Sequence, residues 1–214
     1  MIAENLSKIL ATIPRNVTLV AVSKTKPNSA ILEAYKVGQR VFGENKVQDM
    51  AEKASALPKD IQWHMIGHLQ TNKVKFIAPF VSLIHGVDSL KLLTEINKRA
   101  VQNKRIIDCL LQVYIAKEEA KFGLDHLEVK DLLGLSKAFS NIRIIGLMGM
   151  ATNTKDETQV SEEFSNLKSL TDKLQVENKL LQTISMGMSG DYLLAIKEGS
   201  SMVRVGSAIF GDRN

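Results

Sequence analysis

Short apolar runs rich in β-branched residues alternate along the chain with longer stretches whose apolar residues recur every three or four positions. The run at 17–22 is typical of a buried strand, and residues 28–37, which begin after Pro27, have the spacing of an amphipathic helix. The same pattern predicts further strands at 40–42, 61–66, 80–85, 105–113, 141–148, 181–185 and 202–205. It predicts further helices at 45–57, 71–77, 89–103, 124–139, 157–175, 192–198 and 207–211, and an extra leading helix at 2–13.

Strict alternation of strands and helices indicates a parallel sheet, because each crossover back to a parallel strand needs a covering helix. Periodicity alone leaves a closed barrel and an open doubly wound sheet as alternatives. Repeated strand–helix units within 214 residues favour the barrel, whose usual size is roughly 200–250 residues. We therefore expect an α/β fold, a single (β/α)8 TIM-type barrel domain over residues 1–214 with an extra N-terminal helix.

Composition and charge narrow the possible partners. Hydrophobic residues make up 44% of the chain and charged residues 24%, which is ordinary for a globular protein and argues against disorder. The net charge is +5, but the basic residues are scattered without a long run. This distribution gives little support to nucleic-acid binding, and a modest positive field suits a small phosphorylated ligand.

The expected compartment follows from three features. The first residues lack a basic segment followed by an apolar stretch, and no apolar run approaches the roughly 18 residues of a membrane span. Cys109, the single cysteine, lies in a predicted strand, where a buried inert thiol is the expected state. We expect a cytoplasmic protein without a membrane partner.

Lys24 continues the first predicted strand. Side chains alternate along a strand, and Lys24 therefore shares a face with Val20 and Val22 and points into the mouth of a barrel. Partial desolvation there lowers the pKa of an ammonium and makes the free amine a nucleophile. A solvated lysine at a strand end is the alternative that position alone leaves open.

The second and third strand ends carry further polar candidates. Asn45 shares its strand face with Val41 and Gly43, which would place its amide at the barrel mouth. His64 is expected to line the interior. Its spacing of four from His68 would suit a metal pair only on a helix, and a glycine lies between the two, so we expect no metal.

The last two strand ends have the composition of a phosphate site. Small and hydroxyl residues follow both strands, including Ser189 after the seventh and Gly206 and Ser207 after the eighth. Phosphate sites in barrels commonly form at these two loops. Arg204 lies inside the last strand between two valines, where it needs either a structural salt bridge or a ligand.

Seven segments lie in order at the expected strand ends and span nearly the whole chain. They are AVSKTKP at 21–27, FGENKVQ at 42–48, WHMIGHLQTNK at 63–73, KFG at 121–123, GLMGMA at 146–151, SMGMSGD at 185–191 and VRVGSAIFG at 203–211. Together they resemble the pyridoxal phosphate homeostasis proteins, whose fold is that of the barrel domain of alanine racemase.

The resemblance implies roles for individual residues toward pyridoxal 5′-phosphate (PLP). Lys24 matches the lysine that holds PLP as a Schiff base, and Arg204 matches the residue that faces the pyridine nitrogen. Ser189, Gly206 and Ser207, with the backbone of Met188, match the phosphate-binding turns. Asn45 and His64 match residues that line the pocket, and Lys121 matches a family position whose role stays open.

The resemblance further implies PLP binding, storage and delivery without robust turnover. Racemases of related fold use a tyrosine as acid or base, and none of Tyr35, Tyr114 and Tyr192 shows a motif for that role. We expect a monomer whose recipients are PLP-dependent apo-enzymes. The alternatives are a PLP-dependent amino-acid racemase, a Schiff-base aldolase that uses Lys24 without PLP, and a nucleic-acid-binding protein.

Overall fold

The computed structural model describes residues 1–117 and 122–211, and its centre is a closed barrel of eight parallel strands in sequence order. The strands are β1 (Thr18–Val22), β2 (Val41–Glu44), β3 (Gln62–Met65), β4 (Leu83–Val87), β5 (Ile107–Gln112), β6 (Ile142–Met148), β7 (Thr183–Ser185) and β8 (Met202–Val205). The barrel closes where β1 pairs with β8, with Leu19 opposite Val203. The expected TIM barrel is confirmed, and the open sheet is wrong.

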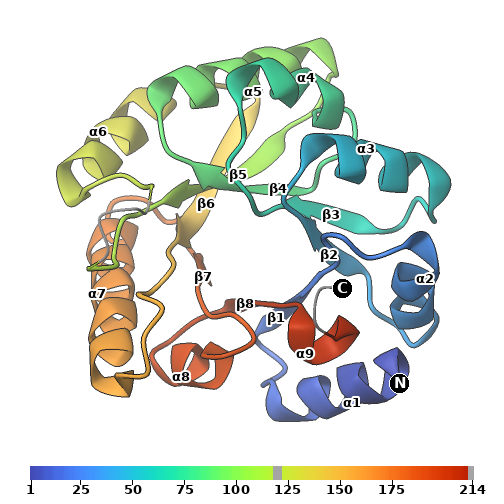
Figure 1. Ribbon diagram of the computed structural model, residues 1–214. Coiled ribbons are helices and arrows are strands. Elements are labelled where there is room, and N and C mark those ends of the chain that lie inside the picture. Colours follow the sequence, from blue (N-terminus) through green and yellow to red (C-terminus); the bar gives the residue numbers. More distant parts are fainter. Residues whose placement is uncertain (118–121, 212–214) are drawn as a thin grey trace.

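Helices surround the barrel as an outer ring (Figure 1). They are α1 (Ile2–Thr12), α2 (Asn28–Lys36), α3 (Val47–Ala56), the 3-10 turn η1 (Thr71–Lys73), α4 (Val74–Ile77), α5 (Leu90–Gln102), α6 (His126–Ser136), α7 (Glu157–Gln175), α8 (Tyr192–Lys197) and α9 (Ser207–Phe210). The first helix, α1, precedes β1 as expected and lies beside α9 (Figure 1).

Several predicted boundaries are wrong by one to three residues, and the fourth strand is an example whose cause is visible. The strand expected at 80–85 begins at Leu83, because the backbone N–H groups of Phe80 and Val81 both donate to the carbonyl of Ile77. These bonds close the last turn of α4 and prevent the same residues from joining the sheet.

Alternating strand residues divide the buried core into two parts. Outward-facing strand residues such as Leu19 and Ala21 pack with the helices in one large cluster. Inward-facing residues form a separate small cluster within the barrel, here called the apolar interior cluster, which consists of Val20, Leu83, Leu110, Met148 and Met202. The same alternation places Lys24, His64, Gln112 and Arg204 on the interior face.

Candidate functional site

A cavity of about 480 Å³ lies at the carboxyl ends of the strands and is lined by residues from both ends of the chain. This volume is within the range of small-molecule sites. Every predicted ligand-binding residue except His64 lines it, namely Lys24, Asn45, Met188, Ser189, Arg204, Gly206 and Ser207. The topology thus brings together residues that are up to nine-tenths of the chain apart in sequence.

Lys24 is half-buried and lies in a tight turn directly after β1. The backbone N–H of Lys26 donates to the carbonyl of Ser23 at 3.0 Å and closes this turn. Thr25, its third residue, has a φ of +65°, the sign that a type II turn requires and that a β-branched residue rarely adopts. The turn therefore holds Lys24 in a defined and strained local geometry.

The turns after β7 and β8 are joined directly. The backbone N–H of Gly206 donates to Ser189 Oγ at 3.1 Å. Gly187 has a φ of +94°, and a side chain there would come within 2.6 Å of Ala195 Cβ. The N–H of Met188 donates to Asp191 Oδ1 at 2.6 Å, which holds the intervening turn closed.

Arg204 enters the cavity from the barrel interior and is 4% exposed. Its Nη1 donates to the carbonyl of Ser185 at 2.8 Å and to Ser185 Oγ at 2.5 Å, and its Nη2 donates to the carbonyl of Gly149 at 3.1 Å. Among the described residues no carboxylate forms a salt bridge with Arg204. Of the two expectations for this residue, the structural salt bridge is therefore wrong within the described part of the chain.

Two buried histidines extend the contacts of Arg204 through the interior. His85 Nδ1 lies 3.0 Å from Ser185 Oγ, and His85 Nε2 lies 3.1 Å from His64 Nδ1. We call Arg204, Ser185, His85 and His64 the polar interior chain. His64 lies in the interior, as expected, but it does not line the cavity: it lies at the far end of this chain from Arg204.

Burial controls the charges of the polar interior chain. Desolvation lowers the pKa of His64 to about 3. The pKa of His85 is lowered well below its usual value by desolvation first, and then by the proximity of His64 and Arg204. Burial also lowers the pKa of Arg204 to about 10, which still leaves the guanidinium charged at neutral pH. The polar interior chain therefore carries a single positive charge, on Arg204, next to the cavity.

Among the cavity residues that sequence reasoning missed, Gln112, Phe122 and His68 are linked by contacts. Gln112 continues the interior face of Leu110, and its Nε2 donates to the carbonyl of Phe122 at 2.9 Å. The ring of Phe122 stacks on that of His68, with centroids 5.5 Å apart, and all three residues line the cavity. The strand alternation that identified Lys24 also identifies Gln112, whereas the stacked pair joins two loops that no pattern connects. Lys121 lies outside the described residues.

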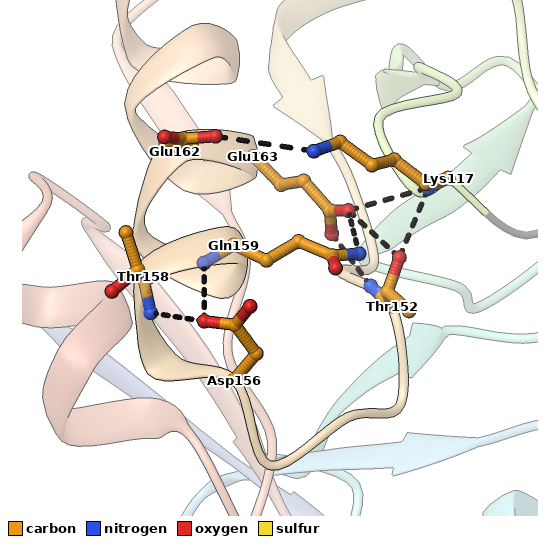
Figure 2. Close-up of polar contacts among 7 residues, drawn as sticks. All are labelled: Lys117, Thr152, Asp156, Thr158, Gln159, Glu162 and Glu163. Atoms are coloured by element: carbon orange, nitrogen blue, oxygen red, sulfur yellow. Dashed lines mark hydrogen bonds and ion pairs between the residues drawn. The ribbon is translucent and has the colours of Figure 1, made fainter.

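A buried carboxylate holds two loops that lead to the cavity (Figure 2). Glu163 of α7 accepts hydrogen bonds from the backbone N–H and hydroxyl of Thr152, at 2.6 and 2.7 Å, and from the backbone N–H of Lys117, at 3.2 Å. Gln159 Nε2 also donates to it at 3.0 Å. Burial pushes the pKa of Glu163 upward, but these hydrogen bonds outweigh burial and leave the pKa lowered. The carboxylate therefore stays charged and braces both loops.

Metal binding and membrane insertion find no support in the described part of the chain. No group of three or more acidic, histidine or cysteine side chains there has the arrangement of a metal site. No described helix is both long enough and apolar enough to cross a bilayer. Cys109 is fully buried, and burial raises the pKa of its thiol, which is the inert state expected from the sequence.

The barrel and its cavity define a protein of the alanine racemase N-terminal type, and the model of the family "Alanine racemase, N-terminal domain" matches residues 1–214. A pyridoxal phosphate homeostasis protein of Aquifex aeolicus is 41% identical over 91% of this chain and 86% of its own length. A protein of the same name from Escherichia coli is 35% identical over 94% of this chain and 88% of its own length. The chain belongs to the family of pyridoxal phosphate homeostasis proteins.

Solved structures agree with this assignment. PipY of Synechococcus elongatus, solved without PLP, superposes with a TM-score of 0.94 at 35% identity, over 99% of this chain and all of that one. Its structure with PLP bound superposes with a TM-score of 0.90. Alanine racemase of Clostridium difficile shares the fold, with a TM-score of 0.84 at 15% identity over 56% of its own chain.

Proposed function

We propose that this chain binds PLP through a Schiff base on Lys24 and takes part in intracellular PLP homeostasis without robust catalytic turnover. The observation that carries the proposal is a single cavity that is lined by Lys24, by Arg204 and by the joined turns of Ser189 and Gly206. The names of the relatives, and the PLP-bound structure of PipY, support the same ligand.

The cavity residues fit the aldehyde, the phosphate and the ring of PLP. When bound, PLP supplies an aldehyde that condenses with amines and a pyridine ring that accepts electrons. The amine of Lys24 would form the covalent bond, and the turns after β7 and β8, with Ser189, Gly206 and Ser207, would hold the phosphate. The N–H of Met188 is already bonded to Asp191, which limits Met188 to a side-chain or shape contribution. Asn45 would contact the ring from the β2 side.

Arg204 favours PLP binding without catalytic turnover. A buried guanidinium can donate hydrogen bonds but cannot accept a proton at neutral pH. A pyridine nitrogen that faces Arg204 therefore stays unprotonated and gives the ring less power to stabilise a carbanion. The polar interior chain holds Arg204 in place, and His64 thus contributes to the site indirectly, through His85 and Ser185.

The attachment site is tested by absorbance and chemical trapping. Purified protein incubated with PLP should show visible Schiff-base absorbance, and borohydride reduction followed by peptide mass mapping should label Lys24. Lys24→Ala should abolish both signals. Lys26→Ala is the matched control, since Lys26 lines the same cavity two residues away and should leave both signals intact. Labelling of a different lysine, or of none, would contradict the assignment.

Turnover and cellular context need separate measurements. Chiral analysis of amino acids incubated with PLP-loaded protein should show no racemisation above the background of free PLP. Racemisation lost in Lys24→Ala would instead favour the alternative, a PLP-dependent racemase. We propose a cytoplasmic monomer that delivers PLP to apo-enzymes, and sedimentation and transfer assays with an apo-aminotransferase test these two points.

A further inference from the structure

The turn that carries Lys24 rests on a buried ion pair between strand β2 and helix α3. Lys53 Nζ donates to Glu44 Oε1 at 2.8 Å, and Ser23 Oγ donates to the same oxygen at 2.5 Å. Lys53 Nζ also donates to the backbone carbonyl of Ser23 at 3.0 Å. Glu44 is fully buried and Lys53 is 9% exposed. The residue directly before Lys24 is therefore bonded to both members of the pair.

A buried ion pair of this kind contributes little net stability, because both charges lose their hydration. Transfer of two charges out of water costs several kcal/mol for each ion, and well-packed apolar residues are often as stable. Glu44 Oε2 is buried and has no hydrogen-bond partner among the described residues, which adds to the cost. Burial raises the pKa of Glu44, and the hydrogen bonds from Lys53 and Ser23 oppose this rise. Such a costly group calls for a role beyond stability.

The backbone next to the pair is also in a costly conformation. Thr25 adopts a φ of +65°, a left-handed conformation that is unfavourable for a residue with a Cβ. The Ser23 carbonyl accepts two hydrogen bonds at 3.0 Å, one from Lys26 N within the turn and one from Lys53 Nζ. Because the ammonium fixes this carbonyl, it also fixes the acceptor on which the strained turn closes.

We propose that Glu44 and Lys53 form a positioning pair that fixes the turn after β1 and thereby aims the amine of Lys24 at the aldehyde of the bound ligand. The inference deepens the proposed function and rests on it, because it assumes that Lys24 is the point of covalent attachment. Neither residue lines the cavity, so the pair acts on the ligand only through the turn.

The test compares two ligands that differ only at the group that Lys24 attacks. PLP carries an aldehyde, whereas pyridoxine 5′-phosphate carries an alcohol and binds without a covalent bond. The double variant Glu44→Gln/Lys53→Met removes both charges together and leaves neither buried alone. We expect its PLP affinity to fall about tenfold or more, and its affinity for pyridoxine 5′-phosphate to stay within about twofold of the unsubstituted protein.

A matched control replaces an ion pair that lies away from the cavity. Arg99 Nε donates to Glu95 Oε1 at 2.5 Å on α5, and no residue of α5 lines the cavity. Glu95→Gln/Arg99→Met should leave the affinities for both ligands unchanged. Melting curves of the ligand-free proteins confirm that each variant is folded before binding is measured.

A milder variant keeps the proposal testable if the double variant fails to fold. Ser23→Ala removes only the hydroxyl bond to Glu44. Ser23→Ala should weaken PLP binding selectively, by a smaller factor than the double variant.

The outcomes separate the two proposals. Equal loss of both ligands in the folded double variant, or native binding of both, would show that the pair does not position Lys24. Failure of the unsubstituted protein to bind PLP on Lys24 would instead contradict the proposed function itself.

Discussion

The interior of the barrel contains two regions of opposite chemistry. The apolar interior cluster, around Leu110 and Met148, consists of buried apolar side chains that pack against one another. The polar interior chain runs from Arg204 through Ser185 to the two histidines and is equally buried. Both regions are built from inward-facing strand residues of one barrel, and β4 and β8 contribute to both. The difference in side chains therefore reflects a difference in task.

The comparison shows which part of the interior serves the fold and which serves the site. Apolar burial contributes stability roughly in proportion to area, and it needs no partner of a particular kind. A buried polar chain gives little net stability, but each member fixes the direction of the next. Only the polar chain reaches the cavity, through Arg204. We infer that the apolar interior cluster stabilises the barrel and that the polar interior chain orients Arg204.

The largest expected effect on stability at neutral pH is in the apolar interior cluster. Leu110→Ala should lower the free energy of unfolding by about 3 kcal/mol, because it leaves a cavity in a fully buried position. Urea denaturation monitored by circular dichroism measures this change. PLP should still attach to Lys24 in the folded variant. A loss below about 1 kcal/mol would mean that the cluster is not a main source of stability.

The next effect is a pH dependence that belongs to the polar interior chain. Both buried histidines are neutral in the folded protein, with the pKa of His64 lowered to about 3, whereas the unfolded chain takes up protons near the ordinary value of 6.5. Their contribution to stability is therefore present above pH 6.5 and is lost as the pH falls toward 3. Well below pH 6.5, each histidine should lower the free energy of unfolding by about 1.4 kcal/mol per pH unit.

The double variant His64→Leu/His85→Leu isolates this pH dependence. It removes both titrating groups and leaves every carboxylate in place, so the difference in unfolding free energy between the two proteins should change by about 2.4 kcal/mol between pH 6 and 5. Urea midpoints at a series of pH values supply the measurement. Parallel curves for the two proteins would show that the histidines take up protons equally in the folded and unfolded states, which contradicts a lowered pKa.

The smallest effect on stability is expected at Ser185, where the polar interior chain contacts Arg204 beside the cavity. Ser185→Ala removes the hydroxyl that lies between Arg204 and His85, and should cost about 1–2 kcal/mol of unfolding free energy. Arg204 also loses one of its fixed acceptors, and the absorbance maximum of bound PLP should therefore shift. A stability loss as large as that of Leu110→Ala, with an unchanged spectrum, would remove the distinction between the two regions.

The architecture was predictable because its signals are local and repeated. The inward faces of α5 and α7 follow helical spacing, and the buried residues of α5 (Leu92, Leu93, Ile96 and Ala100) are those that the spacing indicates. Strand alternation placed Lys24 and Asn45 at the cavity for the same reason. The closed barrel followed from the number of strand–helix units rather than from any single residue.

Charged residues on buried faces were harder to predict. Lys53 lies three residues after Met50 on the inner face of α3, and Glu163 follows Val160 at the same spacing on α7. The spacing indicates burial, but a charged side chain is normally assigned to solvent. Their partners, Ser23 and Thr152, come from distant loops that only the folded barrel brings close. Pairings of this kind are not encoded in a local pattern.

The pairing of β1 with β8 determines when, during synthesis, the cavity can become complete. Lys24 follows the first strand and Ser207 follows the last, and Asn5 of α1 donates to the carbonyl of Ile209 in α9 at 3.2 Å. A nascent chain contains Lys24 early in synthesis, yet it gains the opposite wall of the cavity only when synthesis has passed residue 207. Capture of a reactive aldehyde would therefore report that the barrel has closed.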